Sequence, residues 1–366
     1  MRVLIVPDKF KGTLPAAAAA AAIVAGWKRA RPGDVCDGLP MSDGGDGFGA
    51  ALGALLGARP QMIRTIDAAH RPCDATWWWN AKSKTAIVES ARVIGLAMLP
   101  PGKFHPFALD TFGLGAVISA AGAKGAKHIL VGIGGSATND GGFGLARALG
   151  WEFCDRFGKR IEHWTDLHRL AEIRAPKRRP GCRVTVAVDV RNPLLGRSGA
   201  SRIYGPQKGL RANDFAPAER CLRRLALVAA RQLGKDFARV PGSGAAGGLG
   251  FGLPAFAGAR VQPGFELFAK LAGLERRLRR ADRVVTGEGA LDASTLMGKG
   301  VGQLARHCRE LKIPCIGLAG VMQHTRELDR LFCRAAALTD LTSRKQAKTR
   351  PAFWLERLAA RVAAEI

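Results

Sequence analysis

Apolar runs alternate with polar, glycine-rich loops from the start of the chain. Val3–Val6 is apolar at every position, which is typical of a strand buried on both faces of a sheet. After a polar loop, residues 13–31 predict a helix with Thr13 as its N-cap, because an alanine-rich run follows and a Pro-Gly pair ends it. A strand over residues 35–39 and a helix to about Leu56 complete a βαβα order, which predicts a parallel sheet.

The C-terminal part repeats this order, whereas the middle of the chain has a different pattern. In the C-terminal part we expect strands over residues 283–286, 313–317 and 335–338, a turn over 287–289, and helices over 295–311 and 353–364. In the middle we expect antiparallel strands over 65–79 and 85–89, further strands over 128–132 and 183–188, and helices over 110–123 and 216–234.

This organisation predicts an α/β protein with two domains. One is an open parallel α/β/α domain of the flavodoxin or Rossmann type, built from both termini over residues 1–75 and 284–366. The other is a mixed α/β domain inserted over residues 76–283. No Ser- or Pro-rich linker and no internal repeat divides the chain.

The charge balance favours anionic ligands but leaves their class open. The 366 residues include 56 Lys and Arg against 30 Asp and Glu, a net charge of +26. Nucleotides, phosphates, carboxylates and nucleic acids all fit this excess, and so does a source whose proteins are rich in arginine. Basic clusters at residues 174–183, 276–283 and 344–350 raise the nucleic-acid alternative, but no recognised nucleic-acid motif accompanies them.

The cysteines and the N-terminus favour a cytoplasmic protein. The 8 cysteines form no C-x-x-C pair, so we interpret them as small buried thiols. Charged residues follow the first apolar run too early for a signal peptide. The longest apolar run, Leu14–Trp27, is shorter than the roughly 18–20 residues that a membrane-spanning helix needs.

Several expected strands lead directly into loops that mix glycine with Asp, Asn, Ser and Lys. Such loops are residues 7–12, 42–47, 132–142, 189–193 and 286–292. Because open α/β sheets bind ligands at the carboxyl ends of their strands, these loops together predict a binding site.

Glycine in these loops allows close approach of backbone N–H groups to an anion. The run 132–142 leads into a helix and fits either a phosphate site or a tight, capped turn. The run Gly242–Gly247 matches G-x-G-x-x-G, but no strand precedes it and no acidic partner follows, so we reject a dinucleotide site. It remains a candidate phosphate loop. The chain has no P-loop, kinase-domain, G-x-S-x-G or H-E-x-x-H motif.

Charged side chains in the loops supply the groups that phosphoryl transfer requires. Lysines can clamp phosphates, and carboxylates can hold Mg²⁺ or accept a proton. The candidates are Lys11, Lys208 and Lys299, and the carboxylates Asp43, Asp46, Asp140, Asp189, Glu288 and Asp292. Any one of them can instead be a solvated or turn residue.

Taken together, the loops resemble the bacterial glycerate kinases of the two-domain type that makes 2-phosphoglycerate. The matching stretches occur in the family's order between about residues 2 and 320, and they are residues 7–12, 40–47, 132–142, 189–193, 196–200, 204–209, 242–250 and 286–299. The resemblance implies phosphoryl transfer from ATP to D-glycerate, Mg²⁺ as cofactor and an active cleft between the domains. A kinase for another hydroxy acid, or an inactive relative, is the alternative, and a basic nucleic-acid binder is the third. Neither a membrane nor a nucleic acid is the expected partner, and a homodimer is left open.

The roles of individual residues are assigned from their chemistry. Asp189, Lys208 and Lys11 are the expected catalytic residues. The expected nucleotide-binding residues are Gly134, Gly135, Ser136, Thr138, Asn139, Gly247, Gly248 and Glu288. The expected glycerate-binding residues are Asp8, Asp43, Asp46 and Asn192, and Asp189 and Asp292 are the expected metal ligands.

The sequence departs from the family pattern at five places beside the expected cleft. They are Lys9, where Ser is usual, Arg92–Ile94, where small residues are usual, His105 for Asn, Leu114 for a polar residue and Ser294 for Gln. Several of these replacements are bulky or charged, so they bear on substrate identity.

Overall fold

The computed structural model describes residues 1–177, 181–296, 300–323 and 325–366 and contains two compact α/β units. Unit 1 consists of residues 1–43 and 264–366, and unit 2 consists of residues 44–263. The expected two-domain α/β class is therefore confirmed. The expected boundary at 75/76 differs from this division, because it falls inside a strand of unit 2. Lys299, a candidate phosphate ligand, lies outside the described residues.

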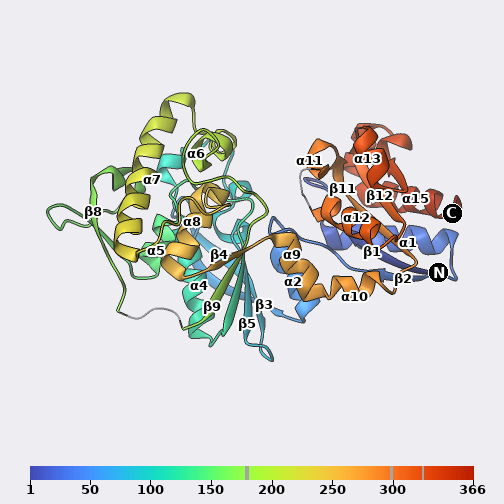
Figure 1. Cartoon of the computed structure of the whole chain (residues 1–366), viewed down its shortest axis with the longest axis horizontal. Helices are drawn as coiled ribbons and strands as arrows, with labels where there is room; N and C mark the ends of the chain where they lie inside the picture. Colours follow the sequence, from blue (N-terminus) through green and yellow to red (C-terminus); the bar gives the residue numbers. More distant parts are fainter. Residues whose placement is uncertain (178–180, 297–299, 324) are drawn as a thin grey trace. The chain divides into compact units, whose positions relative to one another are not determined.

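Unit 1 is built on a five-stranded parallel sheet in the order β13-β12-β11-β1-β2 (Figure 1). Its strands are β1 (Arg2–Pro7), β2 (Val35–Gly38), β11 (Arg283–Leu291), β12 (Cys315–Met322) and β13 (Arg334–Ala337). The turn expected at Gly287–Gly289 is wrong, since these residues continue β11. Gly287 pairs with Leu318 and Glu288 with Ala319 of β12, so the neighbouring strand extends β11 past its glycines.

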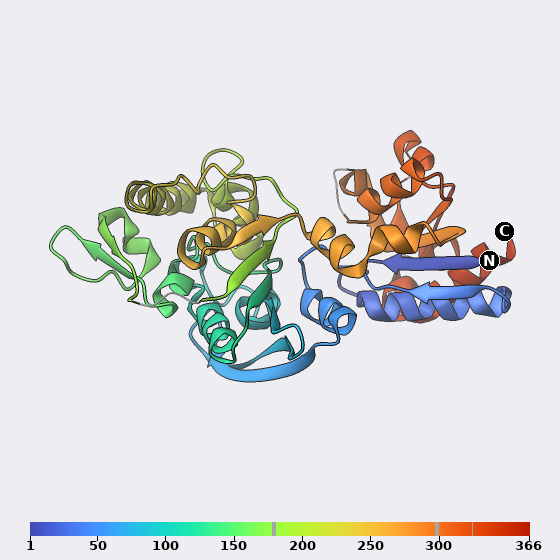
Figure 2. The same ribbon diagram turned by 60° about the horizontal axis from the view of Figure 1, so that its bottom comes forward.

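The helices of unit 1 lie on both faces of this sheet. They are α1 (Ala16–Ala30), α9 (Gly264–Ala272), α10 (Leu274–Leu278), α11 (Ala293–Leu296), α12 (Gly300–Glu310), α13 (Arg326–Leu331), α14 (Arg344–Thr349) and α15 (Pro351–Ala364). Helix α1 packs against α15, and Figure 2 shows α1 running beside β2. Trp27 and Leu355 are fully buried in the core that these two helices form with the sheet. Thr13 is not the N-cap of α1; Pro15 is.

Unit 2 contains a mixed six-stranded sheet in the order β10-β9-β6-β5-β4-β3. Its strands are β3 (Arg59–Ile66), β4 (Pro72–Asn80), β5 (Thr85–Glu89), β6 (His128–Gly132), β9 (Arg183–Ala187) and β10 (Arg260–Gln262). The four strands β5, β6, β9 and β10 are parallel, and β4 and β3 are antiparallel. The single strand expected over 65–79 is instead the pair β3 and β4, joined by a turn in which Asp67 accepts hydrogen bonds from Ala69 N and Arg71 N.

The helices of unit 2 surround a separate hydrophobic core. They are α2 (Phe48–Leu56), α3 (Ala91–Ile94), α4 (Phe112–Ala123), α5 (Phe143–Ala148), α6 (Ala200–Tyr204), α7 (Ala212–Leu233) and α8 (Ala245–Ala257), with short 3-10 helices including η2 (Pro106–Ala108) and η4 (Pro206–Lys208). A small hairpin, β7 (Glu152–Asp155) and β8 (Leu170–Arg174), packs on α7.

One segment, Pro106–Ala123, is long and apolar enough to cross a membrane by length and composition alone. It contains α4, whose Leu114, Val117 and Ile118 are fully buried in the core of unit 2. This burial explains the apolar composition of the segment without a membrane. All eight cysteines are free thiols. Cys154, Cys221, Cys308 and Cys315 are buried as expected, but Cys36, Cys73 and Cys182 are only partly buried and Cys333 is exposed, so the expectation is wrong for these four.

Candidate active site

A glycine-rich turn follows β6 in unit 2 and carries most of the expected nucleotide-binding residues. Ser136, Thr138 and Asn139 are all buried, although they are polar. Gly135 has a φ of 77°, which a residue with a side chain rarely adopts. A Cβ atom there would lie 2.2 Å from Oδ1 of Asp46, so the Asp46 carboxylate lies directly over the turn. The structure thus brings Asp46 together with the expected nucleotide residues.

Lys208 extends into this turn from the 3-10 helix η4. Its Nζ atom donates hydrogen bonds to Oγ of Ser136 at 3.1 Å and to the main-chain oxygen of Thr138 at 2.6 Å. The residue is only 6% exposed. Burial lowers the pKa of Lys208 to about 7, and the nearby Asp140 carboxylate opposes this shift. A buried ammonium held against Ser136 and Thr138 is a strong point charge for a phosphate oxygen.

Asp140 holds the glycine-rich turn in place through hydrogen bonds of its carboxylate. Its Oδ2 accepts hydrogen bonds from Thr111 N, Thr111 Oγ1 and Gly144 N at 2.7–3.0 Å, and its Oδ1 accepts one from Gly142 N at 3.2 Å. The residue is fully buried. Burial raises the pKa of Asp140 to about 6, with a smaller contribution from Asp110, while these hydrogen bonds oppose the shift. Asp140 therefore ties the turn after β6 to the start of α4.

The loop that contains Gly247 and Gly248 packs directly on the same turn. A Cβ atom on Gly247 would lie 1.9 Å from the main-chain oxygen of Thr138, and the N–H of Gly141 donates to the oxygen of Gly247 at 3.0 Å. Residues 246–248 are in the left-handed region, which interrupts α8 near its start. The two expected phosphate loops therefore lie in contact within unit 2. The N–H of Gly134 is already used, since it donates to the oxygen of Gly44 at 3.1 Å.

Asp189 follows β9, the strand next to β6. Gly132 of β6 pairs with Ala187 of β9, so the carboxyl ends of the two strands are level and the loop with Asp189 starts beside the glycine-rich turn. Asp189 is half-buried. Asn192 has a structural use: it accepts a hydrogen bond from the Tyr204 hydroxyl at 2.7 Å and donates one to the oxygen of Ser198 at 2.8 Å.

Unit 1 brings three of the expected carboxylates together at the carboxyl ends of β1 and β11. Asp8 N donates to the oxygen of Gly287 at 2.8 Å, which fixes the residue at the end of β1. Burial raises the pKa of Asp8 to about 7, and the negative charges of Asp43 and Glu288 contribute to the shift. The Lys9 N–H and ammonium act in the opposite direction. A carboxyl group whose pKa is raised in this way fits proton transfer near neutral pH.

Glu288 and Asp292 are connected through a threonine that the sequence did not single out. Oγ1 of Thr295 donates to Oε1 of Glu288 at 2.7 Å and accepts a hydrogen bond from Asp292 N at 3.3 Å. Thr295 is fully buried. Lys11 is exposed, and its backbone N lies against Gly289, where a Cβ atom would be only 3.0 Å away. The glycine in β11 therefore allows the loop with Lys11 to approach the strand.

The expected metal ligands do not form an all-protein metal site. Within residues 1–177, 181–296, 300–323 and 325–366, no group of three His, Cys, Asp or Glu side chains could hold a metal ion. Asp189 belongs to unit 2 and Asp292 to unit 1. Either carboxylate by itself has the oxygen donors that Mg²⁺ prefers, and that ion is commonly held by one or two carboxylates together with nucleotide phosphates.

Three of the five departures from the family pattern have identifiable contacts in the structure. His105 contacts Oδ2 of Asp214 at 3.2 Å and accepts a hydrogen bond from Phe107 N, so it joins the start of α7 to η2. Leu114 is a core residue of α4. Arg92 lies 3.8 Å from Glu89, whose carboxylate accepts hydrogen bonds from two N–H groups at the start of α2. The Ser294 side chain is outside the described part of the chain.

Sequence reasoning missed the residues that support the candidate site. Thr111 and Asp110 lie near Asp140, and the Oγ of Ser201 accepts a hydrogen bond from Asn139 at 2.9 Å. Thr295 binds Glu288, and the carboxylate of Glu89 binds an N–H group at the start of α2. The only signal for Thr295 is its position three residues after Asp292, which is the spacing of a capped turn. The others are distant in sequence from the residues they hold.

Comparison with known proteins supports one family over the whole chain. The family model described as "Glycerate kinase family" matches residues 3–366. The Glycerate 2-kinase of Escherichia coli is 35% identical over 342 residues, which cover 91% of this chain and 90% of that protein. The Glycerate kinase of Halalkalibacterium halodurans is 36% identical over 322 residues, with coverages of 87% and 85%. A crystal structure described as a glycerate kinase 2 from Salmonella typhimurium LT2 has a TM-score of 0.86 and 33% identity, covering 100% of this chain and 98% of that one.

The fold and its relatives define a phosphotransferase of the kinase class with two α/β domains. More specifically, the chain belongs to the glycerate kinase family. The resemblance drawn from the loop motifs is confirmed. Kinases of this family use ATP as a co-substrate, so a nucleotide site is part of the family's activity.

Proposed function

We propose that the protein transfers the γ-phosphoryl group of ATP to D-glycerate and releases 2-phosphoglycerate and ADP. The relative named Glycerate 2-kinase supports the position of the new phosphate ester. The observation that carries the proposal is the buried Lys208 ammonium, held by Ser136 and Thr138 among glycine-rich loops. We further propose that the protein acts in the cytoplasm, where it would take both substrates from solution.

Lys208 has the properties of a phosphate clamp. Burial disfavours its charged form, so its pKa is about 7 without a ligand. A phosphate oxygen near Nζ would favour the ammonium form, because an opposite charge replaces the lost hydration. The main-chain oxygen of Thr138 and the Ser136 hydroxyl hold the ammonium in place beforehand, so little reorganisation is needed when the nucleotide binds.

Carboxylates supply the remaining chemistry that phosphoryl transfer needs. We assign Asp189 to the attacking hydroxyl or to Mg²⁺, and Asp292 as a second candidate ligand of the ion. When bound, Mg²⁺ would neutralise charge on the phosphates. Asp8, whose pKa is raised to about 7, is poised to exchange a proton near neutral pH and remains a candidate for binding glycerate.

The experiment is product identification by phosphorus NMR after incubation with Mg-ATP and D-glycerate. Phosphorus on the C2 oxygen couples to a single C–H proton, whereas phosphorus on the C3 oxygen couples to a CH₂ pair, so the splitting distinguishes the two esters. A reaction without glycerate controls for simple ATP hydrolysis. A folded protein that forms only the C3 ester, or no ester, contradicts the proposal.

A kinase for a different small hydroxy acid is the second candidate, and Lys9 is the observation that favours it. The Lys9 ammonium is close enough to Asp8 to lower the pKa of that carboxyl against the effect of burial. A cation in place of the usual small hydroxyl would favour an acceptor with more negative charge. ADP formation measured with a panel of hydroxy acids decides between the two: glycerate should give the highest kcat/KM, and a dicarboxylic hydroxy acid that exceeds it supports the second candidate.

A further inference from the structure

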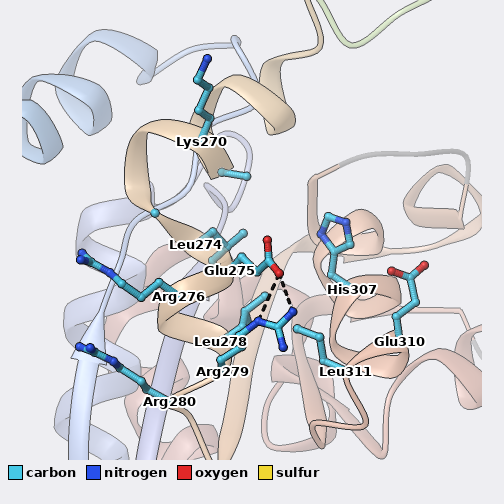
Figure 3. A pocket seen from close by; sticks show the side chains of 12 residues that line it. Lys270, Leu274, Glu275, Arg276, Leu278, Arg279, Arg280, His307, Glu310 and Leu311 are labelled. Atoms are coloured by element: carbon cyan, nitrogen blue, oxygen red, sulfur yellow. Dashed lines mark hydrogen bonds and ion pairs between the residues drawn. The ribbon is translucent and has the colours of Figure 1, made fainter.

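A cavity of about 850 Å³ lies in unit 1 between α10 and the end of α12 (Figure 3). Its volume falls within the range of small-molecule sites. All of its lining residues belong to unit 1, namely Ala269, Lys270, Gly273, Leu274, Glu275, Arg276, Leu278, Arg279, Arg280, His307, Glu310 and Leu311. None of them is a candidate residue for the kinase reaction.

The cavity lies near the amino-terminal ends of the strands of unit 1, whereas the candidate carboxylates of unit 1 lie near the carboxyl ends. Helix α10 leads into the start of β11, and Leu311 precedes the start of β12. Asp8 and Asp292 follow the carboxyl ends of β1 and β11. Since these strands are parallel, all their amino-terminal ends lie on one side of the sheet and all their carboxyl ends on the other. The cavity is therefore separate from the carboxylate cluster of unit 1.

The lining combines an apolar floor with a basic rim. Leu274 and Leu278 are each 1% exposed, and Leu311 is half-buried. Four cations, Lys270, Arg276, Arg279 and Arg280, outnumber the two carboxylates of the lining, Glu275 and Glu310. These arginines belong to the basic cluster 276–283, which contains no candidate residue for the kinase reaction.

Arg279, just after α10, is placed to meet an anion on the side of the cavity that faces α12. Figure 3 shows Glu275 and Arg279 between α10 and His307, with Arg276 and Arg280 on the other side of the helix. Arg279 Nη2 lies 2.7 Å from Glu275 Oε1, but both side chains are more than half exposed, at 63% and 72%. Such surface pairs are weak, so Arg279 can exchange Glu275 for a ligand anion at little cost. Guanidinium groups bind carboxylates, phosphates and sulfonates through paired N–H donors.

We infer that this cavity binds a small organic anion that has an apolar body, at a site independent of the kinase reaction. The apolar part contacts the half-buried Leu311, and the acidic group is held by Arg279 on the side of α10 that faces α12. A fully polar anion would leave the leucine floor unused, and an uncharged apolar molecule would leave the basic rim unused.

The test uses the fluorescent probe 1-anilinonaphthalene-8-sulfonate, which has an apolar ring system and one sulfonate. Its neutral analogue N-phenyl-1-naphthylamine lacks the sulfonate. Both are titrated in saturating ATP and glycerate, against the triple variant Arg276→Gln, Arg279→Gln and Arg280→Gln. The matched control, Arg326→Gln, Arg330→Gln and Arg344→Gln, removes the same charge from positions of unit 1 outside the cavity.

We expect the cavity variant to raise the Kd of the sulfonate probe about tenfold, since the guanidinium of Arg279 that holds the sulfonate is lost together with its two neighbouring charges. The control variant should leave this Kd unchanged, and the neutral probe should bind all three proteins alike. Leu311→Ser should weaken both probes, while glycerate kinase activity stays at the wild-type level in every variant. An unchanged Kd in the cavity variant, or an equal loss in the control, overturns the inference. Loss of DNA-oligonucleotide binding in the cavity variant, without loss of the sulfonate probe, also overturns it and favours a nucleic acid.

Discussion

The ammonium of Lys208 and the main-chain oxygen of Thr138 are 2.6 Å apart inside unit 2, where both residues are buried. This hydrogen bond places a cation at the centre of the loops that the sequence marked as phosphate-binding. The same burial that makes the cation effective also makes it costly, because it lowers the pKa of Lys208 to about 7. The first predictions follow from this balance.

Replacing Lys208 with Met should remove the cation and keep most of the side-chain volume. We expect kcat/KM to fall by about 100-fold or more, as is usual when a preorganised charge is removed from a reacting phosphate. The melting temperature should not fall, because a buried charge is replaced by an apolar chain. Steady-state kinetics and thermal unfolding measure both. Lys159→Met, at an exposed position of the same unit, is the matched control and should behave as wild type.

The activity should depend on pH through Lys208. We expect kcat/KM to decrease as the pH rises through about 7, since the free enzyme then loses the ammonium proton. The corresponding decrease in kcat should occur at higher pH, because bound phosphates stabilise the protonated form of Lys208. A Lys208 pKa below its unfolded value of 10.5 also means that the unfolded chain binds more protons between about pH 7 and 10.5. Relative to Lys208→Met, the wild type should therefore gain stability as the pH rises through this range.

Asp140 should act as a positioning residue for Lys208. Asp140→Asn keeps one oxygen for Thr111 and Gly144 but removes the negative charge that raises the pKa of Lys208. The decrease of kcat/KM with rising pH should therefore occur at a lower pH in this variant than in the wild type. Asp140→Ala removes all the acceptors and should destabilise unit 2 by about 3 kcal/mol. If both variants lose stability equally and neither moves the pH profile, Asp140 has only a structural role.

Asp8 should make the stability of unit 1 depend on pH in the acidic range. Its pKa is about 7 in the folded chain, against an ordinary value of 3.8 in the unfolded chain, so the folded protein binds more protons between these values. The stabilising effect of protonation is present at low pH and is lost as the pH rises through 7. We therefore expect Asp8→Asn to unfold at a higher temperature than wild type at pH 8, and the difference to shrink at pH 4. Thermal unfolding across this range measures it, and a difference independent of pH would falsify the assignment.

Gly247 tests the contact between the two phosphate loops. Gly247→Ala places a Cβ atom 1.9 Å from the Thr138 oxygen and also requires an unfavourable φ of 68°. We expect a loss of more than about 2 kcal/mol in stability together with reduced activity. Gly57→Ala is the control: its φ is 62°, but a Cβ atom there has nothing within 4 Å, so only about 1 kcal/mol should be lost. Equal losses would show that backbone strain alone explains the effect.

The sequence predicted the class of fold and the loops, because both depend on local patterns. Buried parallel strands are continuous apolar runs, and the loops after them contain glycine, so β1, β6 and β9 were recognisable. Glu288 was misassigned to a turn because Gly287 and Gly289 flank it, whereas the pairing of β11 with β1 and β12 keeps all three residues in the strand. Local pattern does not report such long-range pairing.

The side-chain contacts inside the candidate site could not be predicted from the local sequence pattern either. Lys208 was chosen because it stands between polar and glycine residues, but its contacts with Ser136 and Thr138 join segments about 70 residues apart. Asn192 matched the family motif, yet the structure uses its side chain to hold Tyr204 and the loop of Ser198. A motif therefore located the loop correctly and left the use of each side chain open.

The discontinuous construction of unit 1 has a consequence for how the chain folds as it is synthesised. β1 is an interior strand, and its neighbour β11 begins only at Arg283, after all of unit 2 has been translated. Until then, Ile5 and Trp27 have no completed core in which to be buried. The emerging N-terminal segment must remain unassembled while unit 2 folds, and during that interval it is the part of the nascent chain most in need of a chaperone.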